Sequence, residues 1–198
     1  MIAEDEELRR VVDFLKAVSR LKTTSRAGWV RCRVPGTPET IGAHSFGVAV
    51  LAWILSEELG LDTTKAVKMA LTHDLLEAYT GDITPYDVNL VAKREILEQN
   101  AVSELEKILP IKVKSEMLLL IRELREEGSP ESRVVKQADR LDTAFQAFAY
   151  EEIVYGGHPE DSAFFGFFDL AKGARLEGYA QRLLREIERM RGKQGRVD

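Results

Sequence analysis

Apolar side chains recur at intervals of three and four residues along most of the chain, which is the spacing of a helix with one buried face. The pattern is clear near the N-terminus, where it predicts a helix over residues 8–21. Its apolar positions are Leu8, Val11, Val12, Leu15, Val18 and Leu21. No segment shows a convincing period of two, the mark of a half-buried strand. The sequence therefore predicts an all-α protein.

Local signals indicate where the other helices begin and end. Thr40 and Asp62 have the side chains of N-caps, and Gly60 stands where a helix that starts after Thr40 would end. Ser129 followed by Pro130 is a strong start signal, a cap residue with proline at the first helical position. Together these signals predict helices over about 41–59, 63–79, 90–108, 113–127, 130–155 and 176–190.

The remaining segments and the length fix the expected architecture. Residues 22–29 interrupt the first helix, and the proline- and glycine-rich residues 31–42 should form a loop. A tight connection through Gly60 should make the helices over 41–59 and 63–79 antiparallel neighbours. A chain of 198 residues is one domain of ordinary size. We expect a compact single-domain helical bundle over 1–198, with its core at about 8–190 and a frayed tail at 191–198.

Composition limits the partners and the location. The net charge is −5, so no overall basic field attracts nucleic acid or an anionic membrane. The longest apolar run, residues 48–55, is too short to span a bilayer. Cys32 is the single cysteine and has no internal disulfide partner, and the first ten residues are acidic where a signal peptide would be basic. We expect a cytoplasmic protein with no nucleic-acid or membrane partner.

The stretch LTHDLLEAYTGD at 71–82 carries the first candidate chemistry. It contains His73, one of three histidines, beside Asp74 in apolar surroundings. A buried imidazole or carboxylate is costly unless something pairs with it. On a helix that continues to residue 79, His73, Asp74 and Glu77 project around one rim of the last turn, where the helix end adds partial negative charge. This end of the helix is predicted to attract a cation.

Two further residues would complete a metal site. His44 lies in the first turn of the preceding helix, so the antiparallel arrangement would bring it to the same end as His73. Asp139 lies on another helix among apolar neighbours, and its carboxylate is predicted to be buried. Two histidines with Asp74 and Asp139 form a mixed nitrogen and oxygen set. This set suits one divalent transition metal, Mn, Co, Fe, Ni or Zn, and leaves positions for water and substrate.

The order of these residues resembles a known signature. His44, the doublet His73 and Asp74, and then Asp139 are similar to the H…HD…D pattern of HD-domain metal-dependent phosphohydrolases. The blocks RAGWV at 26–30, PETIGAHS at 38–45, HDLLEAYTGDI at 73–83 and VKQAD at 135–139 resemble those of 5′-deoxynucleotidases from bacteria and of their archaeal and human relatives. The resemblance covers about residues 8–190. It departs at Ala43, where the family often has Glu.

Four more residues have expected roles. The helical register of Glu77 with His73 and Asp74 favours a catalytic role for it, acting on water. The match to RAGWV implies that Arg26 is the clamp for a phosphate. The resemblance also places Asp82 facing the substrate, although Asp82 after a glycine is equally well read as a turn residue. Trp29 is expected to be part of the core or of the pocket wall. Read alone, Glu77 would be an ordinary helix-face carboxylate.

The resulting hypothesis is a phosphomonoesterase that hydrolyses nucleoside 5′-monophosphates, with deoxyribonucleotides preferred. Sequence motifs of other chemistries, such as HExxH, GxxxxGK[ST] and GxSxG, are absent. One alternative is an HD phosphohydrolase for a triphosphate, a cyclic dinucleotide or an alarmone. The other is a non-catalytic helical binding protein that holds metal for structure only.

Two features outside the main motifs complete the expectations. The aromatic run FFGFF at 164–168 fits a helix-to-helix dimer contact as well as the protein's own core. We expect a small-molecule nucleotide substrate and a homodimer. His158, in the sequence GGHP, is interpreted as a solvated turn residue.

Overall fold

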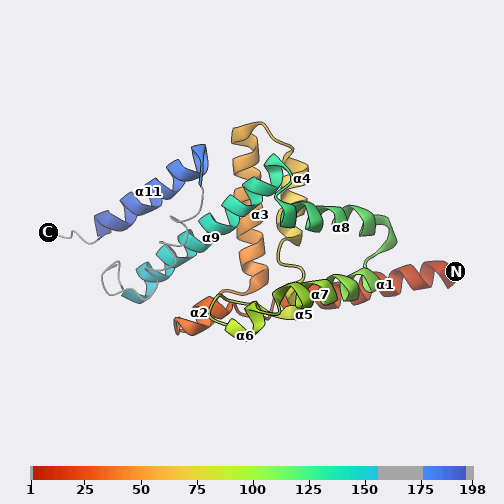
Figure 1. Ribbon diagram of the computed structural model, residues 1–198. Helices are drawn as coiled ribbons and strands as arrows, with labels where there is room; N and C mark the ends of the chain where they lie inside the picture. The colour runs from red at the N-terminus through yellow and green to blue at the C-terminus, as the bar shows by residue number, and fades with distance from the viewer. Residues whose placement is uncertain (1, 156–175, 195–198) are drawn as a thin grey trace.

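The computed structural model describes residues 2–155 and 176–194, and within these ranges the protein is built from helices (Figure 1). They are α1 (Ile2–Leu21), α2 (Ala27–Arg31), α3 (Ile41–Leu59), α4 (Thr63–Thr72), α5 (Glu77–Thr80), α6 (Val88–Val91), α7 (Arg94–Ile108), α8 (Ile111–Glu126), α9 (Pro130–Tyr155) and α11 (Gly178–Gln194). The described residues contain one isolated antiparallel bridge, between Ser25 and Thr40, and no strand. The predicted all-α fold is confirmed.

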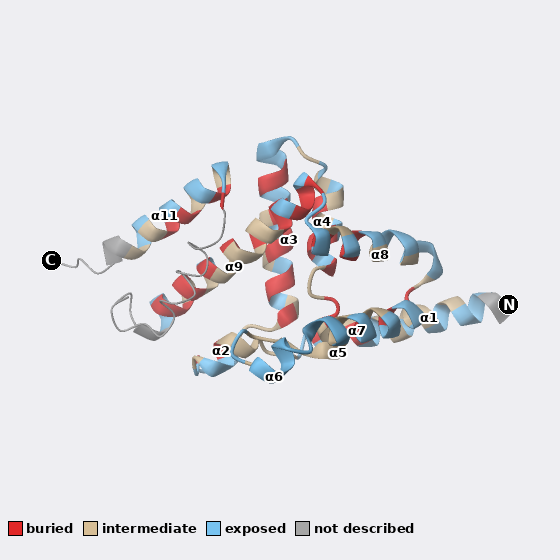
Figure 2. Cartoon of the chain, in the orientation of Figure 1, coloured by how far each residue is buried: buried red, intermediate tan, exposed pale blue. Residues whose placement is uncertain are grey.

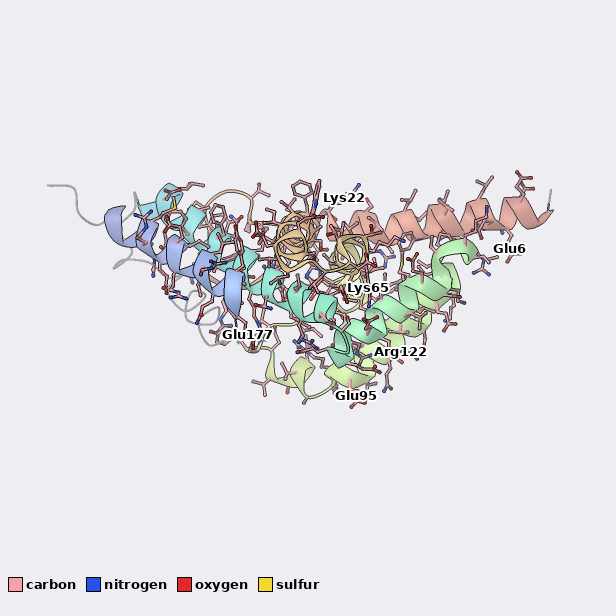
Figure 3. All side chains as sticks on the ribbon, turned by 90° about the horizontal axis from the view of Figure 1, so that it is seen from above. Glu6, Lys22, Lys65, Glu95, Arg122 and Glu177 are labelled. Carbon is pink, nitrogen blue, oxygen red and sulfur yellow. The ribbon has the colours of Figure 1, made fainter. Side chains whose placement is uncertain are left out.

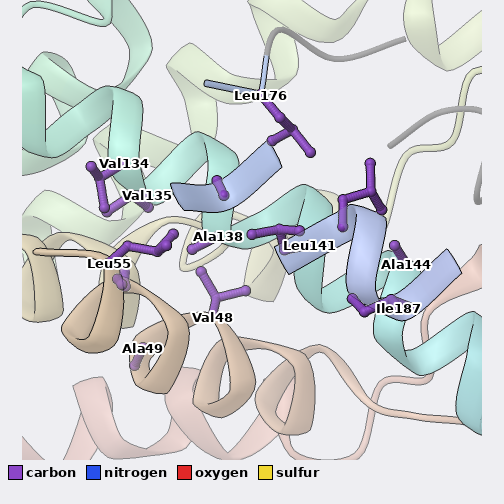
Figure 4. Close-up of a cluster of buried hydrophobic side chains, with 14 of the residues drawn as sticks. Val48, Ala49, Leu55, Val134, Val135, Ala138, Leu141, Ala144, Leu176 and Ile187 are labelled. Atoms are coloured by element: carbon purple, nitrogen blue, oxygen red, sulfur yellow. The ribbon is translucent and has the colours of Figure 1, made fainter. Parts of the chain in front are cut away.

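Helix α3 stands at the centre of the molecule and packs against α4 and α9 (Figure 1). Its buried residues, among them Val48 and Leu55, meet Ala138 and Leu141 of α9 (Figure 4). Figure 2 shows the buried faces of α3 and α9 turned toward each other. Helices α8 and α11 close this larger core, to which α11 contributes Ile187.

A second, smaller core joins α1, α7 and α8 to the start of α3. It contains Leu21 of α1, Ile41 of α3 and Leu105 of α7. Leu75 and Leu76, from the turn between α4 and α5, are 3% and 8% exposed in the same cluster. The turn that carries the HD doublet is therefore anchored by the two apolar residues that follow it.

The predicted caps are confirmed. The Thr40 hydroxyl accepts a hydrogen bond from the backbone N–H of Ala43 at 3.1 Å, and the Asp62 carboxylate accepts one from Lys65 at 2.9 Å. Gly60 ends α3 in the left-handed conformation, with φ 66°, which glycine adopts without steric cost. Each cap satisfies backbone groups that a helix end leaves unpaired.

The expectation of one continuous helix over 63–79 is wrong. Helix α4 ends at Thr72, and α5 begins only at Glu77. Between them the backbone turns more tightly: the N–H of Leu75 bonds to the carbonyl of Thr72, three residues back. The physical reason lies in the ring of His73, whose Nδ1 is 2.7 Å from the carbonyl oxygen of Ala70. That oxygen would otherwise accept the next α-helical hydrogen bond.

The boundaries of other helices also differ from the prediction. Helix α1 begins at residue 2 and not at 8, and α8 begins at residue 111, directly after Pro110. Two short helices, α2 and α6, were not predicted, since their four or five residues are too few to show a period. The predicted helix over 90–108 is interrupted at Lys93, where α6 has ended and α7 has not begun.

Helix α11 continues to Gln194, four residues beyond the predicted end of the last helix, and fraying of the tail stays a prediction. Arg191 forms a two-pronged ion pair with Glu151 of α9, with both nitrogen–oxygen distances at 2.6 Å. Glu151 is 2% exposed, so the pair attaches the last helix to the core. The predictions for His158 and for FFGFF at 164–168 lie outside the described residues.

The outer surface carries both signs of charge. Figure 3 shows acidic and basic side chains, for example Glu6, Lys22 and Arg122, around the outside of the helices. Among residues 2–155 and 176–194, no helix combines the length and the apolar character that crossing a membrane requires.

Candidate active site

The antiparallel packing of α3 and α4 brings the two histidines together. His44 lies in the first turns of α3 and is fully buried, and His73 follows the last residue of α4. Their ring centroids are 5.3 Å apart. Asp139, midway along α9, points between them, with its Oδ1 3.1 Å from Nε2 of His44. Ligand atoms of these three residues all lie within 4.8 Å of one another.

Asp74 approaches the same point from the turn after α4. Its Oδ2 is 3.0 Å from Nε2 of His73 and 3.8 Å from Nε2 of His44. All four predicted metal ligands therefore converge, although they come from three segments separated by up to 95 positions. Their role as ligands stays a prediction, and their convergence is an observation.

One atom in this cluster has its hydrogen-bonding capacity unmet. Nδ1 of His73 is placed to donate to the carbonyl of Ala70, which leaves Nε2 as the unprotonated nitrogen. This Nε2 is buried and has no hydrogen-bond partner in the described chain; its 3.0 Å contact with Asp74 lacks hydrogen-bond geometry. A lone pair facing a carboxylate is repulsive unless a cation lies between them. The donor set and this orphaned nitrogen fit a divalent transition metal.

The acid–base balance of the cluster also requires positive charge. Burial lowers the pKa of His44, but hydrogen bonds with Asp139 and Asp142 outweigh it and raise that pKa to about 10. Burial likewise lowers the pKa of His73, but the negative charge of Asp74 outweighs burial and raises that pKa. The pKa values of Asp74 and Asp139 are lowered by the two imidazoles against the effect of burial. Either protons or a metal ion must compensate these carboxylates.

Glu77, at the start of α5, is the carboxylate without a fixed partner. Its side chain makes neither a hydrogen bond nor an ion pair with any described residue. Burial, and then the negative charges of Asp74 and Asp82, raise the pKa of Glu77 to about 9. A carboxylate with a raised pKa and no partner is suited to hold or exchange a proton.

Arg26, immediately before α2, is the cation of the site. Its Nη1 lies 3.1 Å from the hydroxyl of Thr143, 3.1 Å from Nδ1 of His44 and 3.6 Å from the carboxylate of Glu39. Asp139, among other carboxylates, raises the pKa of Arg26 against the opposing effect of burial. Its Nη2 and Nε groups bond to none of the described residues, so they remain available for an anion.

The other two predicted substrate residues have structural contacts. Asp82 accepts a hydrogen bond from the backbone N–H of Ala27 at 2.6 Å, which ties its loop to the start of α2. Trp29 is 1% exposed, donates to Glu39 at 2.8 Å and packs edge-on against Tyr150. Trp29 therefore belongs to the core, one of its two expected places. A substrate contact for either residue stays a prediction.

Three residues of the site escaped the sequence analysis. Glu39 holds Trp29 and Arg26, Thr143 holds Arg26, and Asp142 lies 2.7 Å from Nδ1 of His44. A signal for two of them was present, because positions three and four after Asp139 share its face of the helix. Glu39, His44 and Asp142 also lie close enough to form a cation site, but the guanidinium of Arg26 beside them disfavours it.

Comparison with known proteins agrees with this geometry. A family model described as HD domain matches residues 18–165, three quarters of the chain. The chain belongs to the HD-domain family. Among its relatives in the family is the human 5′-deoxynucleotidase HDDC2, 30% identical over 91% of this chain and 85% of the human protein. The 5′-deoxynucleotidase hdd1 of Schizosaccharomyces pombe is 29% identical over 90% of each chain.

Solved structures show the same fold in this HD-domain family. The PH0347 protein from Pyrococcus horikoshii OT3 is 32% identical, with a TM-score of 0.72, over 90% of this chain and 99% of that one. A conserved hypothetical protein from Pyrococcus furiosus is 31% identical, with a TM-score of 0.70 and the same coverage. The helical arrangement of this chain is therefore shared with solved structures of similar proteins.

Proposed function

We propose that this HD-domain protein hydrolyses deoxyribonucleoside 5′-monophosphates to nucleoside and phosphate. The observation that carries the proposal is Glu77, a carboxylate of raised pKa and without a partner, beside the His–Asp cluster. A site that holds metal only for structure needs no such group. The names of the relatives HDDC2 and hdd1, both 5′-deoxynucleotidases, support the choice of substrate.

The residues that would hold the metal are His44, His73, Asp74 and Asp139, whose ligand groups converge. A divalent ion there supplies positive charge that polarises the phosphoryl group and acidifies a nearby water. Mn, Co, Fe, Ni and Zn all suit this donor set. Metal analysis of the purified protein would identify which of them is bound.

The protein's own side chains account for the remaining requirements of hydrolysis. Glu77 orients the attacking water and, in its ionised form, takes the proton of that water. The water oxygen bonds to phosphorus, the bond to the 5′ oxygen breaks, and that oxygen leaves as the nucleoside hydroxyl with the proton that Glu77 took from the water. Arg26 neutralises phosphate charge through Nη2 and Nε. Its Nη1 contacts with Thr143 and Glu39 hold the guanidinium in place.

Charge favours a monophosphate over a triphosphate. One arginine can meet one terminal phosphate, whereas Asp74, Glu77 and Asp82 would oppose the additional negative charge of a triphosphate. Asp82 has one oxygen held by Ala27, and its other oxygen would accept a hydrogen bond from a sugar hydroxyl. Trp29 would support the wall beside the 2′ position from within the core.

Phosphate-release kinetics on dAMP, AMP, 3′-AMP and dATP test the proposal. We expect kcat/KM for the 5′-monophosphates to exceed that for 3′-AMP and dATP by at least about tenfold, or roughly 1.4 kcal/mol. Base identity should matter less. A preference for dATP would favour the alternative of another nucleotide specificity. Absence of turnover on any nucleotide, in protein that binds metal, would favour the binding-protein alternative.

We also infer that the protein is a homodimer. Helix α3 exposes Phe46, Val50 and Trp53, which share one side of the helix, and Phe46 and Trp53 are 71% and 58% exposed. An apolar stripe of this kind on a central helix supports an interface. Light scattering should give twice the chain mass, and Trp53→Glu should reduce it to one. A monomeric wild-type protein would contradict the inference. The cytoplasmic location stays a prediction.

A further inference from the structure

The contacts of His44 require a choice between two neighbours. Its Nδ1 lies 2.7 Å from a carboxylate oxygen of Asp142 and 3.1 Å from Nη1 of Arg26. A ring nitrogen cannot both donate to the carboxylate and accept from the guanidinium. The shorter contact, with a charged acceptor, is the stronger one. Arg26 has another acceptor for Nη1 in Thr143, so its contact with the ring can be lost without an unpaired donor.

When the Nδ1 proton of His44 is donated to Asp142, the protonation of the other ring nitrogen in the neutral imidazole is also fixed. In the neutral ring that would bind metal, Nε2 of His44 is the unprotonated nitrogen and faces the carboxylates of Asp139 and Asp74, at 3.1 and 3.8 Å. This is the tautomer that a metal-binding histidine needs. Asp142 lies beyond the ring from the cluster, so it acts on the site through His44.

Gly47 provides the space that Asp142 occupies. It lies three residues after His44 on the same face of α3. A Cβ atom at this position would be 2.0 Å from Oδ1 of Asp142, closer than any real contact. Glycine inside a helix weakens it relative to alanine. At this position the close approach of the carboxylate supplies a reason for the glycine.

We propose that Asp142 is a positioning residue that fixes the tautomer and orientation of His44, and that Gly47 is required because it leaves room for the Asp142 carboxylate. The sequence pattern did not assign a role to either residue. The proposal rests on the proposed function only in taking His44 as a metal ligand. It is independent of which nucleotide is hydrolysed.

Metal affinity measured without substrate tests the role of Asp142. We titrate the metal-free protein with Mn²⁺ and with Co²⁺, whose visible spectrum reports ligand geometry. Asp142→Ala should weaken binding about 10- to 100-fold, the range for partners of metal-ligating histidines. Asp142→Asn keeps an acceptor oxygen for Nδ1 and should lose less. Excess metal should restore most of the kcat of both variants, which a direct catalytic role would not allow.

Gly47→Ala supplies an independent test. The added methyl group displaces the carboxylate, so this variant should lose metal affinity although alanine favours a helix. In the double variant with Asp142→Ala the methyl group finds space, so the two losses should not add. Asp13→Asn, on the exposed side of α1, is the control for loss of an acidic residue and should bind metal as the wild type does.

The outcomes separate this proposal from the proposed function. Weakened metal binding in Asp142→Ala and Gly47→Ala supports the proposal even if no nucleotide is hydrolysed. Unchanged affinity in a folded Asp142→Ala protein overturns it, even if the protein is an active nucleotidase. Additive losses in the double variant overturn the role of Gly47. A wild-type protein that binds neither ion overturns the whole proposal.

Discussion

The two histidines of the site are held in opposite ways. His73 is oriented by its own backbone, because its Nδ1 bonds to the carbonyl of Ala70 three residues earlier. His44 is oriented by Asp142, which is 98 positions away on another helix. Both arrangements leave Nε2 facing Asp74 and Asp139. One is local in sequence, and the other exists only after α3 and α9 have packed.

This difference separates two kinds of vulnerability. No single side-chain replacement removes a backbone carbonyl, so the orientation of His73 depends on the shape of the turn after α4. The orientation of His44 depends on one carboxylate and on the space beside Gly47. Disturbance of the interface between α3 and α9 should therefore impair the His44 side of the site first.

The largest expected effect comes from Asp139, which meets the ring of His44 directly. Asp139→Ala should abolish turnover and lower thermal stability in the presence of metal, because bound metal stabilises the folded state. Exhaustive chelation of the wild type should do the same. Phosphate release, metal content and the melting temperature would be measured on the same samples. Full activity at zero metal content would contradict the assignment of the ligand set.

The next largest effect is expected from replacing Glu77, whose side chain bonds to neither histidine. Glu77→Ala should keep its metal and its fold while kcat falls by roughly two to four orders of magnitude, the range for loss of a general base. Loss of metal in this variant would instead make Glu77 a ligand. Unchanged kcat would remove it from the mechanism.

The smallest expected effect is the change in stability of the metal-free protein with pH. The folded-state pKa values of His44 and Glu77, about 10 and about 9, both lie above their ordinary values. Groups with raised pKa values contribute stability at low pH that is lost as pH rises through the folded pKa. The melting temperature of the metal-free protein should thus fall from about pH 4.5, where Glu77 begins to ionise in the unfolded chain alone, to about pH 9. The fall should be steeper above about pH 6.5, the ordinary pKa of histidine, where His44 adds to it.

Bound metal and the substitution Glu77→Gln should each reduce this loss of stability at higher pH. Metal binding requires neutral imidazole, so the stabilisation by metal should grow over the same pH interval. Glu77→Gln cannot ionise, and its metal-free form should lose less stability than the wild type on going from pH 5 to pH 8. Scanning calorimetry at matched ionic strength measures both. A melting temperature of the metal-free wild type that rises with pH would contradict the assigned directions.

The parts of the fold that were predictable are those specified by neighbouring residues. Periodic apolar faces and the caps at Thr40, Asp62 and Gly60 depend on local chemistry, so α3 and α9 were predicted at their observed bounds and α8 to within two residues. Helix α1, which has no such cap signal, begins six residues before its predicted start. The end of α4 at Thr72 was not, because it follows from the bond between the ring of His73 and the carbonyl of Ala70. An apolar period continues through that point in the sequence and hides it.

The residues of the site also fall into those that the sequence predicted and those that depend on tertiary packing. The convergence of His44 with His73 was predictable, because a short connection makes consecutive helices antiparallel. Asp142 was not identified: it shares the helix face of Asp139, but the spacing alone does not show that its partner is His44. The same holds for Glu39, whose contacts with Arg26 and Trp29 depend on tertiary packing.

Because of the ion pair between Arg191 and Glu151, the residue at which the chain is cut at its C-terminal end should affect stability. A chain shortened to residue 190 loses only eight residues, yet it leaves the almost fully buried carboxylate of Glu151 without this counter-charge. Removal of one partner from a buried pair typically costs about 3–5 kcal/mol, comparable to the whole stability of a marginal domain. Trimming this end to aid crystallisation, or attaching a rigid fusion partner directly to it, would therefore weaken a helix that packs on α9, the element that carries Asp139.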